Sequence, residues 1–351
     1  METMLSNIYD EQNVLKNILL NFQDKNIHIL EDLKNYNIKR VLILATGSSI
    51  NAAVTAKYFL QDILEAKIYI EEPSIFCDYE KIDLEIDLII VISQSGKSAS
   101  TINATKKIVE VLKKPLIIVT NNIKSPIVKY SQYILDLNIG IENVGFVTKG
   151  FSGTILNLFL LGIILKNQHL KYFRELEYLI DKISKIIEET NLYFEKNKEV
   201  LRDINRFICL GYGANYGITK EFETKFTEVV RCPSTGHELE AYMHGPYLEA
   251  NKSNAIFYLD LDLNILLSKR LHTLKKYMEN YIGFSTIITN SNDENGQTIN
   301  LNISKDINPN FLTLLYVIPI QVLSYRIAKE KKINVEKKIF TDFDLVLKSK
   351  I

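Results

Sequence analysis

The stretch from Leu88 to Thr101 constrains the fold of this chain more than any other. It begins with five consecutive apolar residues, 88–92, continues as Ser-Gln-Ser-Gly-Lys-Ser, and then shows apolar residues at helical spacing. An apolar run without alternation is typical of a strand buried on both faces of a parallel sheet. The sequence therefore predicts a strand, a short hydroxyl-rich turn and a helix, the repeating unit of an α/β fold.

The turn in this unit has the composition of an anion site. Ser95 and Ser98 occupy positions typical of helix N-cap and first-turn residues. Unpaired N–H groups and the positive end of the helix dipole favour an anion there, and the hydroxyls add donors. For a single turn, an ordinary serine-rich helix cap explains the pattern equally well.

A second turn favours the anion site. The apolar strand 41–45 ends at Thr46-Gly47-Ser48-Ser49 and runs into another helical segment. Parallel strands bring both turns to the carboxyl edge of the sheet, where open α/β sheets bind ligands. Neither turn has a dinucleotide or Walker pattern, so the sequence predicts a small phosphorylated ligand.

Both turns carry a family resemblance. ATGSSIN (45–51) and ISQSGKSAST (92–101) resemble the two phosphosugar-binding turns of SIS (sugar isomerase) domains. From about Leu30 to the C-terminus the chain resembles the isomerase half of glucosamine-6-phosphate synthase and its stand-alone relatives, which include sugar-phosphate deaminases and fructoselysine-6-phosphate-type deglycases. The resemblance implies a substrate phosphate among Ser49, Ser93, Gln94, Ser95 and Ser98, with Gly47 and Ser48 in the same substrate-binding loops.

The order of patterns predicts two such domains. Strands are expected near 41–45, 68–71, 88–92, 116–119 and 133–137, and a second strand, Gly-rich turn and helix begin at Arg206. The expected fold is α/β, with two SIS domains, each a flavodoxin-like three-layer sandwich around a parallel sheet. The expected parts are a helical lead-in (1–35), a first SIS domain (36–170), a linker helix (171–199), a second SIS domain (200–332) and a C-terminal tail that closes on the site (333–351).

The second domain is expected to supply chemistry. Its strand at 255–259 ends in Asp260-Leu261-Asp262, so acids stand where a phosphate would sit. Glu221, Lys225 and Glu228 share a helix face, since they are spaced by four and three. Aldose–ketose chemistry needs a carboxylate base and a group such as imidazole that opens the ring.

From the residues alone, a solvated glutamate and a backbone-bonding turn histidine explain this stretch as well. ETKFTEV and ELEAYMHGP resemble the catalytic stretch of the family, which implies that Glu228 is the base and Glu221 a supporting carboxylate. By the same resemblance His244 opens the ring, reaching the site of the neighbouring subunit.

Two further segments match the family in part. Thr148 and Lys149 match a loop that closes on the sugar, although Val147 stands where a serine is common, and Lys149 also fits an ordinary surface lysine at a helix start. Near the C-terminus, Lys348 is the better match to a lysine that forms an imine with the open-chain ketose, and Lys350 is the second candidate.

The composition of the chain limits which ligands, cofactors and cellular locations are expected. The chain has 42 basic and 42 acidic residues, which gives no sign of nucleic-acid or anionic-membrane binding. Its three cysteines and five histidines form no ligand pattern, so no metal or other cofactor is expected. No apolar run of membrane-spanning length and no signal peptide are recognised, and a cytoplasmic location is expected.

These patterns lead to one functional expectation. No glutaminase domain precedes the SIS unit, so we expect a stand-alone enzyme acting at C1/C2 of an amino-substituted sugar 6-phosphate and releasing an amine or ammonia. The alternatives are a synthase-like aminosugar-phosphate isomerase that uses ammonia, a non-amino sugar-phosphate isomerase, and a non-catalytic phosphosugar sensor. A homodimer or a dimer of dimers is expected.

Overall fold

The structure is a computed structural model that describes residues 2–166, 168–262, 264–291, 297–304 and 306–351. The chain forms two compact units, and neither is continuous in sequence. Unit 1 comprises Met1–Gln12, Asn143–Thr148 and Glu175–Lys337, and unit 2 comprises Asn13–Glu142, Lys149–Arg174 and Lys338–Ile351.

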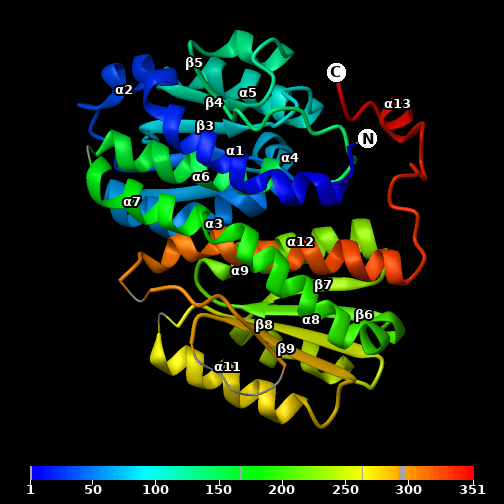
Figure 1. Cartoon of the computed structure of the whole chain (residues 1–351). Coiled ribbons are helices and arrows are strands. Elements are labelled where there is room, and N and C mark those ends of the chain that lie inside the picture. Colours follow the sequence, from blue (N-terminus) through cyan, green and yellow to red (C-terminus); the bar gives the residue numbers. More distant parts are fainter. Residues whose placement is uncertain (1, 167, 263, 292–296, 305) are drawn as a thin grey trace. The chain divides into compact units, whose positions relative to one another are not determined.

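Unit 2 contains a parallel sheet of five strands in the order β2-β1-β3-β4-β5 (Figure 1). Its central strands β3 and β4 are buried at every residue, as their uninterrupted apolar sequences predict. The five strands lie at the predicted places: β1 (Arg40–Leu44), β2 (Lys67–Glu71), β3 (Leu88–Ile92), β4 (Leu116–Thr120) and β5 (Tyr133–Asp136).

Helices flank this sheet. Alternate strand residues such as Leu42 and Val91 pack with Phe76 and Ile108 of α4 and α5 in one hydrophobic cluster, while α3 and α6 pack against each other. α6 is buried along its whole length. The helices of this unit are α2 (Ile27–Leu33), α3 (Ser48–Leu64), α4 (Pro73–Asp78), η1 (Pro126–Tyr130), α5 (Ala99–Val111), α6 (Lys149–Leu165) and α13 (Phe343–Leu347).

Unit 1 repeats this topology. Its sheet is also parallel, and its order β7-β6-β8-β9-β10 corresponds strand for strand to that of unit 2. The predicted architecture, two α/β/α domains with parallel sheets, is therefore confirmed. The strands are β6 (Arg206–Gly211), β7 (Ser234–Glu238), β8 (Asn254–Asp260), β9 (Phe284–Thr289) and β10 (Thr298–Asn300).

In unit 1, α8, α9 and α12 pack together, and α11 contacts β8 (Figure 1). The elements are α8 (Ile183–Asp203), α9 (Asn215–Lys225), η2 (Phe226–Val230), α10 (Leu239–Met243), η3 (Pro246–Glu249), α11 (Ile265–Met278), η4 (Pro309–Leu312) and α12 (Thr313–Glu330). Two helices are divided between the units, α1 (Met4–Lys25) and α7 (His169–Ile180).

Two expectations need correction. The linker predicted as one helix over 171–199 consists of two, α7 and α8, which are separated by a turn at Asp181–Lys182. The segment Pro309–Glu330 also has the length and apolar composition of a membrane span, contrary to the expectation that the chain contains no such run. Almost all of it is buried inside the protein, as in a core helix.

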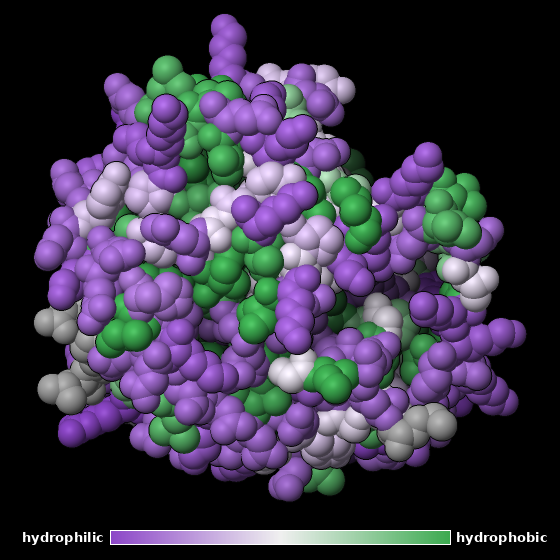
Figure 2. Space-filling model, turned by 90° about the horizontal axis from the view of Figure 1, so that it is seen from above, coloured by the Kyte–Doolittle hydropathy of each residue, from purple (hydrophilic) through white to green (hydrophobic). Residues whose placement is uncertain are grey.

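Figure 2 shows one face of the surface, which is mainly hydrophilic, with hydrophobic side chains in separate patches.

Candidate active site

The two predicted turns lie at one edge of the sheet in unit 2. β1 and β3 are neighbours in parallel register, with Leu44 opposite Val91, so the turns that follow them are adjacent. Gly47 has a positive φ of 59° and precedes α3, which begins at Ser48 and Ser49. A side chain at position 47 would strain this backbone, which explains the glycine.

The turn after β3 offers several donors. Within the described residues, the backbone N–H groups of Gln94, Ser95 and Ser98 donate no hydrogen bond. Ser98 is the N-cap of α5, but its side chain does not cap the helix; its Oγ accepts from Thr101 Oγ1 at 3.0 Å. Ser93 is buried at the start of the turn. Amide groups at a helix start, together with hydroxyls, form an arrangement that binds phosphate.

The C-terminal tail pairs with this same turn. Ala99 N–H donates to Ser349 O (3.1 Å), and Ile351 N–H donates to Lys97 O (2.9 Å). Ser98 and Lys350 form an antiparallel bridge, and Lys350 Nζ also contacts Asp344 at 2.7 Å. The predicted imine lysine, Lys348, follows α13 one residue before these contacts and is exposed.

The loop before α6 becomes buried where it enters the helix. Thr148 and Lys149 are both buried, so the reading of Lys149 as a surface lysine is wrong. The hydroxyl of Thr148 donates to Phe146 O at 3.1 Å, and its carbonyl accepts from Gln321 Nε2 at 3.4 Å. The Thr148 hydroxyl proton is therefore used inside the protein.

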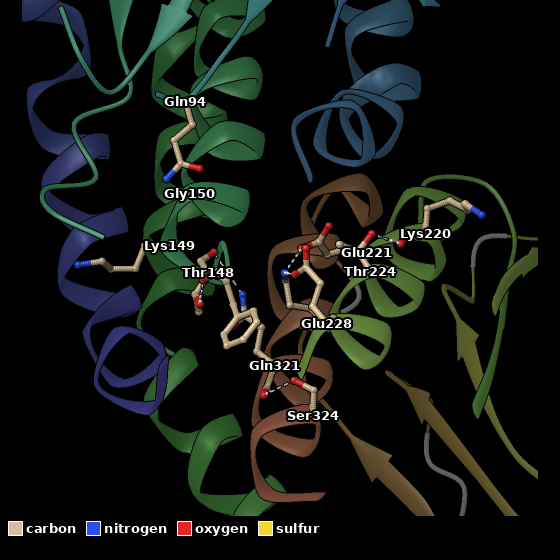
Figure 3. A network of polar contacts seen from close by, with 12 residues as sticks. Gln94, Thr148, Lys149, Gly150, Lys220, Glu221, Thr224, Glu228, Gln321 and Ser324 are labelled. Carbon is tan, nitrogen blue, oxygen red and sulfur yellow. Dashed lines mark hydrogen bonds and ion pairs between the residues drawn. The ribbon is translucent and has the colours of Figure 1, made fainter. Parts of the chain in front are cut away.

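In unit 1 the predicted carboxylates flank a buried lysine. Lys225 Nζ lies 2.9 Å from Glu228 Oε2 and 3.5 Å from Glu221 Oε1. The side chains of Lys225 and Glu221 are fully buried, while that of Glu228 is 43% exposed. Figure 3 shows the side chains of Glu221, on α9, and Glu228, on η2, pointing toward one another. The sequence-based set of site residues omitted Lys225, although its spacing placed it on their face.

Glu228 lies in an unusual stretch of helix. α9 passes directly into the π-helical turn η2, which ends at Arg231 with a left-handed φ of 55°. The rings of Phe222 and Phe226 stack beneath this junction, with their centroids 3.9 Å apart, and hold the junction against the sheet. π-turns are rare and occur frequently at functional sites, since the added residue redirects a side chain. Glu228 thereby reaches solvent while Lys225 stays inside.

His244, the predicted ring-opening residue, makes no direct polar contact with Glu221 or Glu228 in the described residues. It ends α10, whose first turn is capped by the Glu238 carboxylate, and it precedes Gly245, which has a φ of 137°. Its side chain is exposed. Among the described residues no hydrogen bond or ion pair joins His244 to Glu221 or Glu228.

The carboxyl edge of the second sheet holds a carboxylate of the protein itself. Asp260 ends β8, the counterpart of β3, and is fully buried. It accepts hydrogen bonds from Tyr212 (2.5 Å), Ser268 (2.8 Å) and His272 (2.9 Å). Burial alone would raise the pKa of Asp260, but these hydrogen bonds hold it below the ordinary value.

The described part of the chain contains no cluster of side chains that could ligate a metal ion. No three His, Cys, Asp or Glu side chains there lie close enough together to hold an ion. Unit 2 thus has a turn with several hydrogen-bond donors, and unit 1, considered separately, has a cluster of two carboxylates and a lysine.

Comparison with known protein families gives a match for the part of the chain that contains the turns after β1 and β3. Residues 35–162 match the family model of the SIS domain. This segment is similar to the SIS domain. The β1–α3 and β3–α5 turns both lie within it, and so does the start of α6.

Known proteins match nearly the whole chain in sequence. A glutamine–fructose-6-phosphate aminotransferase (isomerizing) from Buchnera aphidicola subsp. Baizongia pistaciae is 25% identical over 350 residues, covering 95% of this chain and 57% of the relative. The chain thus spans little more than half the length of such relatives.

Solved structures match in fold. A candidate phosphosugar isomerase from Clostridium difficile 630 has a TM-score of 0.88 and 27% identity, covering 100% of this chain and 99% of that one. A glucosamine-6-phosphate deaminase from Thermotoga maritima has a TM-score of 0.77 and 22% identity, covering 95% and 96%. The predicted resemblance to SIS proteins is confirmed.

Proposed function

We propose that this chain is an enzyme that acts at C1 and C2 of an amino-substituted sugar 6-phosphate and releases an amine or ammonia. One observation carries the proposal: Glu228 is accessible to solvent while its carboxylate is fixed by a fully buried lysine. A proton-transferring base needs both access to the substrate and a fixed position. The donor-rich turn after β3 supports a phosphate as the anchor of the substrate.

In a ketosamine, the amine is on C1 and the carbonyl on C2. Glu228 removes a proton from C1, which gives an enol with a double bond between C1 and C2. Protonation of C2 then gives an imine at C1, and water adds to release the amine and leave an aldehyde. With a 2-amino aldose the proton moves from C2 to C1, the imine forms at C2, and water releases ammonia and leaves a ketose.

The other predicted residues have roles in the same proposal. His244 passes a proton to the ring oxygen as the cyclic sugar opens, and Glu221 with Lys225 supports Glu228. Ser49, Ser93, Ser95, Ser98 and the Gln94 N–H hold the phosphate. Lys348 would form an imine with the open-chain ketose.

The experiment is a substrate screen. The protein is incubated with ketosamine and aminosugar 6-phosphates, and released amine or ammonia is measured beside a Glu228→Gln sample. Release by the wild type alone supports the proposal. Binding of these compounds without turnover would instead indicate a phosphosugar sensor.

The similarity to glutamine–fructose-6-phosphate aminotransferases favours a second candidate, the synthetic direction. The same steps in reverse would combine ammonia with fructose 6-phosphate. Product formation from fructose 6-phosphate and ammonium, with no release from the aminosugar phosphates at matched concentrations, would select this candidate.

A further inference from the structure

A carboxylate that the site described above does not use caps the start of α6. Glu142 accepts hydrogen bonds from Lys149 N–H (2.9 Å) and Gly150 N–H (3.2 Å), the first amides of that helix. These amides have no partner within the helix, and the helix dipole is positive there. A carboxylate is therefore stable in this position, and its location is set by main-chain groups.

The same carboxylate also binds the side chain of Gln94, in the turn after β3 that we propose holds the substrate phosphate (the phosphate turn). Gln94 Nε2 donates to Glu142 Oε2 at 3.0 Å. A Cβ at position 150 would lie 2.6 Å from Nε2 and from Oε1 of Gln94. The side-chain amide of Gln94 therefore packs directly against the backbone of α6 at Gly150, where there is no space for a side chain. Figure 3 shows Gln94 pointing to the start of α6 beside Gly150.

The main chain of Gln94 is fixed as well. Its carbonyl accepts from Asn121 N–H at 2.9 Å and from the Thr120 hydroxyl at 3.2 Å. With its side chain tied to Glu142, Gln94 has one polar main-chain group left, its N–H, which donates to nothing in the described residues. That N–H belongs to the set of donors at the predicted phosphate site.

We infer that Glu142 is a positioning residue for phosphate binding, acting through Gln94. The clamp of Glu142, Gln94 and Gly150 ties the turn after β3 to α6 and keeps the Gln94 N–H aligned with the other donors of the turn. The inference rests on the proposed function, because it assumes that this turn holds the phosphate of the substrate. The side chain of Gln94 has no contact with the phosphate in this scheme.

A double-mutant cycle tests the clamp. Glu142→Gln and Gln94→Met each remove the charge-assisted bond with little change in size, and Glu110→Gln on the exposed surface of α5 is the matched control. Calorimetry measures the affinity for inorganic phosphate and for fructose 6-phosphate. We expect each single variant to bind both probes about tenfold more weakly. The double variant should be no weaker than the weaker single, since both changes break one interaction.

Turnover separates positioning from chemistry. KM should rise in the clamp variants while kcat stays within about threefold, because the clamp does not touch the reacting carbons. Gly150→Ala provides an independent route, since its Cβ displaces the Gln94 side chain and leaves Glu142 in place. Gly145→Ala is its control, because a Cβ there meets nothing within 4 Å.

The outcomes are distinguishable. Unchanged affinity in Gln94→Met and Gly150→Ala, or fully additive losses in the double variant, would overturn the clamp while leaving the proposed function intact. A wild-type protein that binds neither probe would contradict both. Should Glu142→Gln not fold, Gln94→Met and Gly150→Ala decide the matter, because they leave the helix cap in place.

Discussion

At the scale of single residues, Glu228 combines two properties that seldom occur in one glutamate. Its side chain is 43% exposed, yet it is bonded to a lysine that is only 1% exposed. The sequence predicted the shared helix face of Glu221, Lys225 and Glu228 from spacing alone, and the ion pairs confirm it. Spacing carries no information on burial, so the role of Lys225 was not recognised.

Glu228→Gln keeps the shape of the side chain and removes the base. We expect kcat to fall by about 10²–10⁴-fold, the usual contribution of general acid–base catalysis, with KM within a few-fold of the wild type. Steady-state kinetics on the substrate found in the screen measures both. Glu188→Gln, on the exposed face of α8, is the control. A variant that retains most of its kcat would rule out Glu228 as the base.

At the scale of elements, strands with uninterrupted apolar sequences were predictable, and polar ones were not. β7, Ser234–Glu238, lies at the end of the strand order beside β6, and its sequence has no apolar run. Its place depends on Gly236, where a Cβ would lie 2.0 Å from the Thr219 carbonyl oxygen of α9. Contacts of this kind between distant segments have no local signal, and neither has the π-turn that redirects Glu228.

The end of β8 gives a prediction on stability. Asp260→Asn should lower the free energy of unfolding by about 2 kcal/mol near pH 7, because hydrogen bonds to a buried carboxylate are lost. The folded pKa of Asp260 lies below its ordinary value, so the carboxylate stabilises the fold above about pH 4. That contribution disappears as the pH falls through the folded pKa.

Urea unfolding between pH 7 and about pH 3.5 measures this difference, which should shrink at the acidic end. Asp262→Asn, whose side chain is exposed two residues away, is the control and should show a much smaller effect. Equal stability of Asp260→Asn and the wild type at pH 7 would show that the network contributes nothing.

The tail gives a prediction on binding. Removing residues 349–351 deletes the two backbone hydrogen bonds to Lys97 and Ala99, so we expect KM to rise about tenfold. Lys350→Ala is the matched control, because it keeps the backbone pairing and removes only an exposed ion pair, which contributes little. Kinetics that are the same for the shortened and full chains would show that the pairing is not needed.

At the scale of the whole molecule, the expectation of a shared site can be tested directly. His244 is exposed, and among the described residues no hydrogen bond joins it to Glu221 or Glu228. Its action in the site of a neighbouring subunit stays a prediction. Glu228→Gln and His244→Ala proteins, each nearly inactive, should recover part of the activity when they are unfolded and refolded together. Up to about a quarter of wild-type activity is expected, since half of the chains form mixed dimers with one intact site each.

Separately refolded and then mixed samples are the control for this experiment, and light scattering gives the oligomeric state. A fully active monomer at micromolar concentration would exclude a shared site.

The division of the chain between the units also has a consequence for synthesis. Residues 1–12 of unit 1 leave the ribosome before any part of unit 2, and residues 338–351 of unit 2 leave it after all of unit 1. The sheet of unit 2 is thus made early, while the segment that pairs with Lys97–Ala99 arrives only when unit 1 has been translated. During translation the turn after β3 therefore stays without its two backbone hydrogen bonds to the tail until the last residues of the chain exist.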